Sequence, residues 1–332
     1  MNLNLIRYGE NRFDSYWNRG TVDNSIVHPF YSSLLRTFDH QILANNLVSD
    51  DSFVVTDEGD RVLALVPLYR CSIGEKIVYS SHDSHHLAPI IFGQENSHLH
   101  QTVLQKCFTH IDDLSKENNI YCHSIYYTAP TIVQGIYLYN PLVSYGYVDQ
   151  SCAGLILSLD EDEEILWRNI RKSYRPLINK ALRNNEVLVV DSDNYDFNLC
   201  EEYRRLHSIA AGRETRIKES FYQQYRLVEC NQGYLVFIIN NNQFLGAYFF
   251  YYLNECAFYA SAATRPECDV QSGIGHLGLW RGIQKAKELG AHYMDFGKFL
   301  LDKADPKLAN IEFFKLGFGG RKVVVFRGAK KF

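Results

Sequence analysis

The stretch YLVFIINNNQFLGAYFFY, residues 234–251, consists of two apolar segments separated by three asparagines. Asparagine tolerates the positive φ angles of tight turns, so the pattern predicts a β-hairpin. A second stretch, SFVVTDEGDRVLALVPLY at residues 52–69, has apolar segments around an Asp-Glu-Gly-Asp turn. The chain therefore carries the same hairpin signal twice, about 180 residues apart.

The same elements are predicted after each hairpin. A strand comes next, KIVYSSH from Lys76 and CAFYASAA from Cys256, so that Tyr79 and Tyr259 correspond. Amphipathic helices at residues 98–117 and 275–290 follow, and then strands at 119–127 and 291–297. Because the order hairpin, strand, helix, strand occurs twice, we expect a duplicated α+β domain, with one copy in residues 1–155 and the other in residues 156–332.

Charge, apolar runs and cysteine spacing limit the classes of function that we expect for this chain. The net charge is −4 and the pI about 6.3, which does not favour binding of DNA. The first residues lack the features of a secretory signal, and no apolar run reaches the roughly 20 residues of a membrane span, so we expect a cytoplasmic protein. The eight cysteines lie singly, which indicates reduced thiols.

A turn between the predicted strand from Cys256 and the helix from Gly275 is a candidate cofactor site. It contains Gln271, Ser272, Gly273 and Gly275. Backbone N–H groups at a helix N-terminus can bind a pyrophosphate, and glycines make them accessible. The turn is one residue short of the Q/R-x-x-G-x-G/A turn of acetyl-CoA-dependent N-acetyltransferases. The alternative is a loop whose glycines serve only for turning.

Two basic segments are candidate substrate-binding regions. Lys172 and Arg175 belong to a series of cations at three- to five-residue spacing, which can grip phosphates or form a solvated helix face. The segment HSIAAGRETR, which contains His207, Arg213 and Arg216, places charged residues beside a glycine and predicts a functional loop.

Four motifs resemble the Fem-type aminoacyl transferases and related acyltransferases, which consist of tandem GNAT-like domains. They are LWRNIRKSYRPLINKAL (166–182), AAGRETR (210–216), YMDFGK (293–298) and NIEFFKLGFGG (310–320). The resemblance spans nearly the whole chain. It implies two tandem GNAT-like domains, each a mixed, mostly antiparallel sheet flanked by helices, with the donor site in the C-terminal domain. It also implies transfer of an acyl group to an amine.

The resemblance assigns roles to individual residues. Phe314 and Lys315 match the motif whose lysine is implicated in transfer, and Arg175 matches a basic position at the substrate phosphates. With Phe313, Phe314 and Phe318 around it, the Lys315 ammonium would be partly desolvated and could stabilise an oxyanion. Otherwise, Lys315 would point outward from a strand. Tyr259 is a further candidate for the substrate site.

The attacking amine must lose a proton, so a general base is expected. Asp295 and Glu214 are the candidates, although either could instead pair with an arginine. No Ser-His-Asp or Cys-His arrangement stands out, so we expect direct transfer with sequential kinetics.

The segment SSHDSHHLAP holds His82, Asp83, His85 and His86, whose spacing fits no zinc pattern. We expect no metal there, and expect His85 to contact substrate.

Three functions remain open. The first is transfer of an acyl group, from acetyl-CoA as co-substrate, to an amino sugar or sugar-nucleotide in the biosynthesis of a bacterial surface polysaccharide of the cell envelope. The second is transfer from aminoacyl-tRNA to a peptidoglycan or glycan precursor, with tRNA as partner. The third is a non-catalytic module that binds a phosphorylated glycan.

Overall fold

The computed structural model of the protein describes residues 2–24, 27–81, 85–93, 97–128, 139–268, 270–299 and 306–332. The chain divides into two compact units, Met1–Ala153 with Val323–Phe332, and Gly154–Lys322. The boundary after Ala153 lies two residues before the one expected after residue 155. The last ten residues, however, were expected in the second domain and belong to the first unit, because strand β18 (Arg327–Lys331) pairs with strands of that unit.

The first unit contains two sheets, of strand order β1-β3-β4-β8 and β10-β18-β9-β6-β5-β2, with β7 paired to β9. Its other strands are β1 (Asn4–Arg7), β2 (Leu47–Asp50), β3 (Phe53–Thr56), β4 (Val62–Val66), β5 (Tyr69–Ile73), β6 (Lys76–Tyr79), β7 (His86–Leu87), β8 (Ile90–Ile91), β9 (Cys122–Tyr126) and β10 (Val148–Asp149). Its helices are α1 (Phe13–Val22), η1 (Pro29–Tyr31), α2 (Ser33–Leu43), α3 (His98–Glu117) and η2 (Pro141–Tyr145).

The second unit contains one sheet of order β12-β13-β14-β15-β16-β11-β17. The strands are β11 (Cys152–Ser158), β12 (Glu186–Val190), β13 (Gly233–Asn240), β14 (Gln243–Leu253), β15 (Cys256–Thr264), β16 (Tyr293–Phe299) and β17 (Arg321–Val325). The helices are α5 (Glu163–Asn169), α6 (Tyr174–Asn184), α7 (Phe197–Ala211), α8 (Lys218–Glu229), η3 (Val270–Ser272), α9 (Ile274–Glu288) and α10 (Pro306–Leu316).

Both predicted hairpins form, as β3–β4 and β13–β14. In each unit a helix connects two parallel strands, α3 between β6 and β9 and α9 between β15 and β16. The structure thus confirms the α+β class. The first unit differs from the expected single sheet, since Pro67 separates β4 from β5 and these strands join different sheets. Proline cannot donate to a strand ladder, which explains the break.

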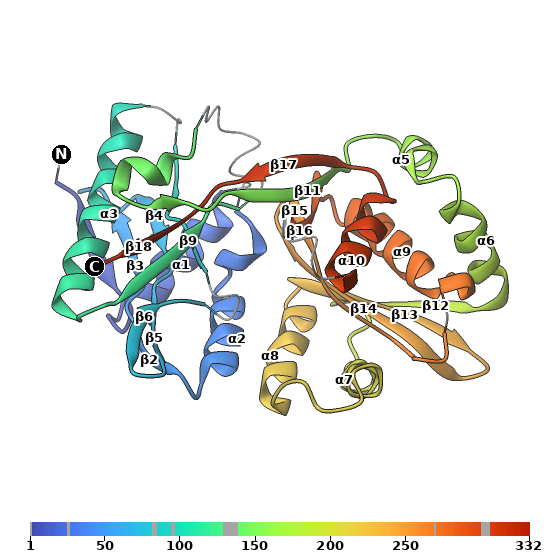
Figure 1. Cartoon of the computed structure of the whole chain (residues 1–332). Coiled ribbons are helices and arrows are strands. Elements are labelled where there is room, and N and C mark those ends of the chain that lie inside the picture. The colour runs from blue at the N-terminus through green and yellow to red at the C-terminus, as the bar shows by residue number, and fades with distance from the viewer. Residues whose placement is uncertain are drawn as a thin grey trace. The chain divides into compact units, whose positions relative to one another are not determined.

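The sheet of the second unit is covered on both faces (Figure 1). Alternate residues of β14 point to opposite sides. Tyr248 and Phe250 pack against α9, where Gly278 and Gly282 leave room for their rings. Phe249 packs on the other face, against Tyr203 of α7. The unit is therefore a three-layer sandwich in which β13 and β14 are largely buried, whereas the middle of β15, residues 258–262, is partly exposed.

Candidate functional site

Lys315 lies near the end of α10 with its side chain directed into the second unit. Its Nζ donates a hydrogen bond to the backbone oxygen of Phe296 at 2.6 Å and lies 5.7 Å from the ring centroid of Tyr259. Burial lowers the pKa of Lys315 below its usual 10.5, whereas the nearby Asp295 and Glu312 carboxylates oppose this shift. The ammonium is therefore half-buried but retains negative charge close by.

These contacts place Lys315 where two parallel strands diverge. Along β15 and β16, both fully described, the parallel register covers Cys256–Phe258 against Tyr293–Asp295. Tyr259 and Phe296 are the next residue of each strand. A pair of diverging strands leaves backbone groups without a ladder partner, so a ligand can reach them. Lys315 supplies a cation at this position.

An aromatic cluster fixes the end of α10. Tyr174, His276 and Phe318 surround Phe314, with ring centroids 5.1–6.1 Å from it. A Cβ on Gly317 would lie 2.0 Å from the Tyr174 ring, so only glycine fits there. The resemblance-based candidate Phe314 thus holds the helix that carries Lys315.

Arg171 forms further contacts at the same end of α10. Its backbone N–H donates to the oxygen of Gly317 at 2.8 Å, and its guanidinium lies 3.8 Å from the ring centroid of Phe313. The guanidinium also donates to the Tyr174 hydroxyl at 2.8 Å. The motifs at residues 166–182 and 310–320, which are far apart in the sequence, therefore pack together around the end of α10.

The two candidate bases differ in position. Asp295 is 6% exposed and accepts a hydrogen bond from the Gly297 N–H at 2.6 Å. Glu214 is exposed and lies 3.7 Å from a guanidinium nitrogen of Arg204. Asp295 acts electrostatically on Lys315, so it belongs to the candidate site, whereas Glu214 pairs with Arg204.

Side chains of the loop between α7 and α8 form hydrogen bonds with the two flanking helices. His207 Nδ1 lies 2.9 Å from the Thr215 hydroxyl, and Arg216 donates to Gln224 at 2.7 Å. Burial, and secondarily Arg216, lowers the pKa of His207 to about 4, so the ring is neutral at pH 7. Arg213 is exposed. These contacts explain the fold of the loop, and a substrate role for it remains a prediction.

The predicted phosphate-binding cations lie at the start of α6. Lys172 is exposed just before the helix. Arg175 is half-buried, and its Nε has no hydrogen-bond partner among the residues that the structure describes. Arg175 therefore retains an unsatisfied donor.

The Gln271–Gly275 turn leads into α9 as predicted, but other elements cover it. A Cβ on Gly273 would lie 2.3 Å from the backbone oxygen of Leu177 in α6, and the site of a Cβ on Gly275 faces Phe314 of α10 at 3.8 Å. Lys180 donates to the backbone oxygen of Gln271, and Ser272 Oγ accepts from the N–H of Ile274. The space beside Gly273 is thus used for packing against α6, whereas Gly275 has ordinary contact distance to Phe314, and a cofactor role for this turn remains a prediction.

His85 lies in the first unit, and its ring nitrogens contact the guanidinium of Arg327. His82 and Asp83 lie outside the described residues. His86 is buried and accepts from the Tyr69 N–H at 2.7 Å. Within the described ranges, no cluster of three or more potential metal ligands occurs.

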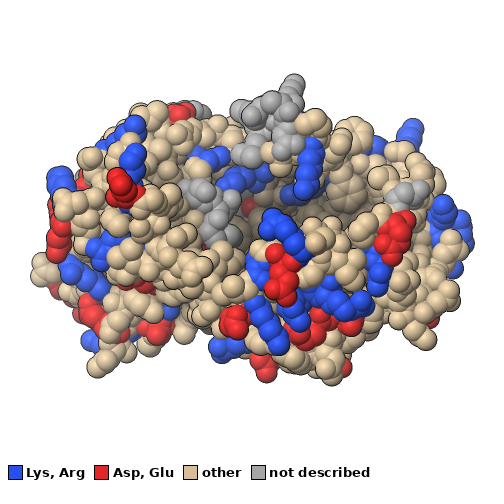
Figure 2. Space-filling view, turned by 60° about the horizontal axis from the view of Figure 1, so that its bottom comes forward, with Lys and Arg blue, Asp and Glu red and all other residues tan. Residues whose placement is uncertain are grey.

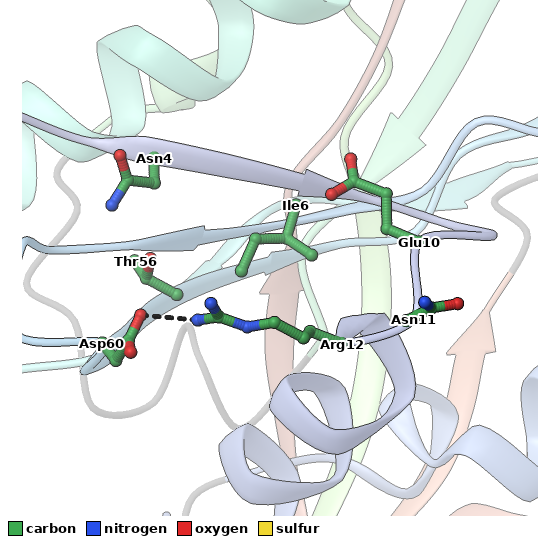
Figure 3. A pocket seen from close by; sticks show the side chains of 7 residues that line it. All are labelled: Asn4, Ile6, Glu10, Asn11, Arg12, Thr56 and Asp60. Carbon is green, nitrogen blue, oxygen red and sulfur yellow. Dashed lines mark hydrogen bonds and ion pairs between the residues drawn. The ribbon is translucent and has the colours of Figure 1, made fainter.

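A hollow of about 340 Å³ lies on the first unit (Figure 3). In it Arg12 points toward Asp60, and 2.8 Å separate the guanidinium from the carboxylate. Thr56 is fully buried in its wall. The lining residues are Asn4, Ile6, Glu10, Asn11, Arg12, Thr56 and Asp60. None of these residues was predicted as functional from the sequence.

The mixture of positive and negative side chains on the surface agrees with the low net charge of the chain. On the face shown in Figure 2, lysine and arginine side chains are interspersed with aspartate and glutamate. A polyanion would therefore meet local basic groups on this face and no continuous basic surface. Among the described helices, none is long and apolar enough to span a bilayer.

Solved structures share the fold. No protein-family model and no curated protein sequence matches the chain. The structure of FemX matches with a TM-score of 0.69 at 12% identity, covering 97% of this chain and 96% of that one. The C-terminal domain of a putative lysylphosphatidylglycerol synthetase from Agrobacterium fabrum matches with 0.63 at 8% identity, covering 96% and 92%.

A tandem GNAT protein from the clavulanic acid pathway matches with a TM-score of 0.53 at 10% identity, covering 99% of this chain and 98% of that one. Together these matches show that the chain has the tandem GNAT-like fold of Fem-type and related acyltransferases. At such low identities the comparison establishes the fold, and the reaction has to be argued from the site.

Proposed function

We propose that the protein transfers an acyl group to an amine and that the second unit carries the transfer site at Lys315. The observation that carries this proposal is the ammonium of Lys315 at the point where β15 and β16 diverge, next to the buried carboxylate of Asp295. The fold shared with FemX and the tandem GNAT protein supports the reaction class.

In this reaction the amine nitrogen attacks the acyl carbonyl carbon, a C–N bond forms, and the bond to the leaving group breaks. Negative charge develops on the carbonyl oxygen. An ammonium has three N–H donors, of which Phe296 accepts one, so Lys315 can direct another at this oxygen. Asp295, directly or through water, takes the proton that the amine loses.

For the donor, we favour an aminoacyl ester on tRNA over acetyl-CoA. In the turn that would hold the pyrophosphate of acetyl-CoA, Gly273 packs directly against the backbone of Leu177 in α6, which leaves less room on that side for a cofactor. The fold match to FemX agrees with this choice. Acetyl-CoA remains the second candidate donor, because tandem GNAT proteins have the same fold. Incubation with labelled aminoacyl-tRNA and, separately, with labelled acetyl-CoA distinguishes the two. Label transferred only from acetyl-CoA would reject our preferred donor.

For the acceptor, we propose an amino sugar, free or nucleotide-linked, in a glycan or peptidoglycan precursor. Arg175, with its unsatisfied Nε, and Lys172 are positioned to bind phosphates of a nucleotide-linked acceptor. Since activated donors and nucleotide sugars are made inside the cell, we place the reaction in the cytoplasm.

Replacement of Lys315 by methionine tests the catalytic role. We expect the rate of transfer to fall by about 10²- to 10³-fold, the usual effect of removing one oxyanion donor, while acceptor affinity is retained. The matched control is Lys322→Met, since Lys322 is an exposed lysine of the same unit. Full turnover in Lys315→Met would refute the assignment. Binding of a phosphorylated glycan without turnover in the unmodified protein would instead support a non-catalytic module.

A further inference from the structure

A second hollow, of about 420 Å³, opens on the unit that contains Lys315. It is lined by Glu163, Glu164 and Trp167 of α5, Asn179 of α6 and Trp280 of α9. None of these residues belongs to the transfer site described above. We call this hollow the tryptophan pocket.

Two indole rings form its apolar wall. The ring centroids of Trp167 and Trp280 are 5.2 Å apart and the ring planes are inclined by 54°. Trp280 is only 6% exposed, and the exposed remainder borders the pocket. An aromatic wall of this kind binds the apolar face of a ring-shaped ligand, or a cation through the negative face of the indole.

Two carboxylates form the polar wall, and one of them is held in place. Glu163 accepts a hydrogen bond from the side-chain amide of Gln284 at 2.5 Å, and Gln284 in turn accepts from Arg281 at 2.7 Å. The side chains of Glu164 and Asn179 form no hydrogen bond or ion pair with the rest of the described chain. The pocket therefore offers a fixed carboxylate, a free carboxylate and a free amide.

These groups together define the ligand chemistry. Carboxylates attract an ammonium, the indoles add cation–π attraction, and the amide of Asn179 can bind hydroxyl groups. The volume is sufficient for a small ring-shaped ligand. An ammonium, hydroxyl groups and an apolar ring face occur together in a sugar that carries a free amine.

We propose that the tryptophan pocket binds a protonated amino sugar and thereby selects unacylated acceptors. This inference rests on the proposed function, in which an amine is acylated. Acylation removes the ammonium charge at that nitrogen, so the pocket would bind the acylated sugar more weakly. Trp280 lies one helical turn after His276, whose ring contacts Phe314 beside Lys315, so α9 connects the pocket with the helix of the transfer site.

Tryptophan fluorescence reports directly on this pocket. The chain has three tryptophans, and two of them line it, while Trp17 is buried in the first unit. We would titrate the full chain with glucosamine, N-acetylglucosamine and choline at about pH 6, where the amine of glucosamine is protonated. N-acetylglucosamine lacks the ammonium, and choline lacks the sugar ring. Loss of either contact should weaken binding by roughly 1 kcal/mol, so glucosamine should bind at least about five-fold more tightly than the other two.

A charge-neutral variant identifies the site. Glu164→Gln should weaken glucosamine binding by about five-fold or more, since it removes the free carboxylate. Glu161→Gln is the matched control, because Glu161 is an exposed carboxylate near the start of α5 that does not line the pocket, and should bind as the unmodified protein does. Equal binding of glucosamine by both variants would overturn the proposal. Equal binding of N-acetylglucosamine or choline would also overturn it.

The binding assay is independent of turnover, so the two proposals can fail separately. Lys315→Met should bind glucosamine normally while losing transfer. If glucosamine does not bind but amines are acylated with the aid of Lys315, only the inference about the pocket is wrong. If glucosamine binds in the pocket but no amine is acylated, the proposed reaction is wrong.

Discussion

The Lys315 ammonium is the group whose charge the proposed reaction requires. Because burial lowers its pKa below 10.5, its charge should be lost at a lower pH than that of an exposed lysine. We expect kcat/KM to fall as pH rises through this lowered pKa. Lys315→Arg should keep its charge to higher pH, so the ratio of its kcat/KM to that of the unmodified enzyme should increase with pH. A ratio independent of pH would assign the alkaline fall to another group.

His276 is a buried titratable residue that should make the fold sensitive to acid. Burial, and secondarily Arg171, lowers its pKa from 6.5 to about 4. A depressed pKa means that the unfolded chain binds the proton more tightly. The stability contributed by neutral His276 is therefore complete above pH 6.5 and is lost as pH falls toward 4.

His276→Phe should retain the contacts with Tyr174 and Phe314 and remove this titration. Urea denaturation at several pH values should show a loss of unfolding free energy between pH 6.5 and 4 that is smaller in the variant by about 1 to 2 kcal/mol. His207, whose pKa is also about 4, should preserve part of the effect. An unchanged pH dependence in His276→Phe would contradict the prediction.

Helix α9 approaches the sheet closely because it carries glycines at the contact. A Cβ on Gly278 or on Gly282 would lie 2.0 Å from the ring of Tyr248 or of Phe250. We expect Gly278→Ala and Gly282→Ala each to lower the free energy of unfolding by at least about 2 kcal/mol, because rings packed between a helix and a sheet cannot move aside.

Gly275→Ala provides the matched control in the same helix. Its Cβ would meet Phe314 at an ordinary 3.8 Å, and alanine favours helix. Chemical denaturation of the three variants measures the difference. Equal stability of all three would show that α9 can shift without cost.

At the level of elements, local patterns predicted most of the fold. Helix α3 spans the predicted residues 98–117 because its apolar period and the Ser97 cap, which accepts from the His100 N–H, are both local signals. The segment around Lys315 is a helix, not the strand considered as the alternative. Phe314 packs against His276 and Phe318 at its end, whereas Phe313, which was expected to bury Lys315, is 61% exposed.

The geometry of the candidate site around Lys315 could not be predicted, because it is formed by contacts that no local sequence pattern encodes. The oxygen of Phe296 that accepts from Lys315 and the backbone of Leu177 that closes over Gly273 lie far from their partners in the sequence. Motif matching could suggest that these residues are functional. It could not show that Gly273 is required for packing against α6.

At the scale of the whole molecule, the chain returns to its first unit at the C-terminus. Strand β18 pairs antiparallel with β9 over five residue pairs, Arg327–Lys331 against Cys122–Tyr126. Lys330 reinforces this arrangement through an ion pair with Asp112 at 2.7 Å. Phe326, just before the strand, belongs to the core of the first unit. The last ten residues should therefore stabilise the N-terminal unit.

Deletion of residues 327–332, which removes β18 and leaves β17 intact, tests this prediction. We expect the amides of β9 to lose protection against hydrogen exchange, because β9 loses a neighbouring strand, whereas those of β13 and β14 in the second unit should keep theirs. Deletion of Phe332 alone, which lies after the paired strand, should leave β9 protected. If the longer deletion instead exposes β13 and β14, the C-terminal strand stabilises the second unit, as its position in the sequence first indicated.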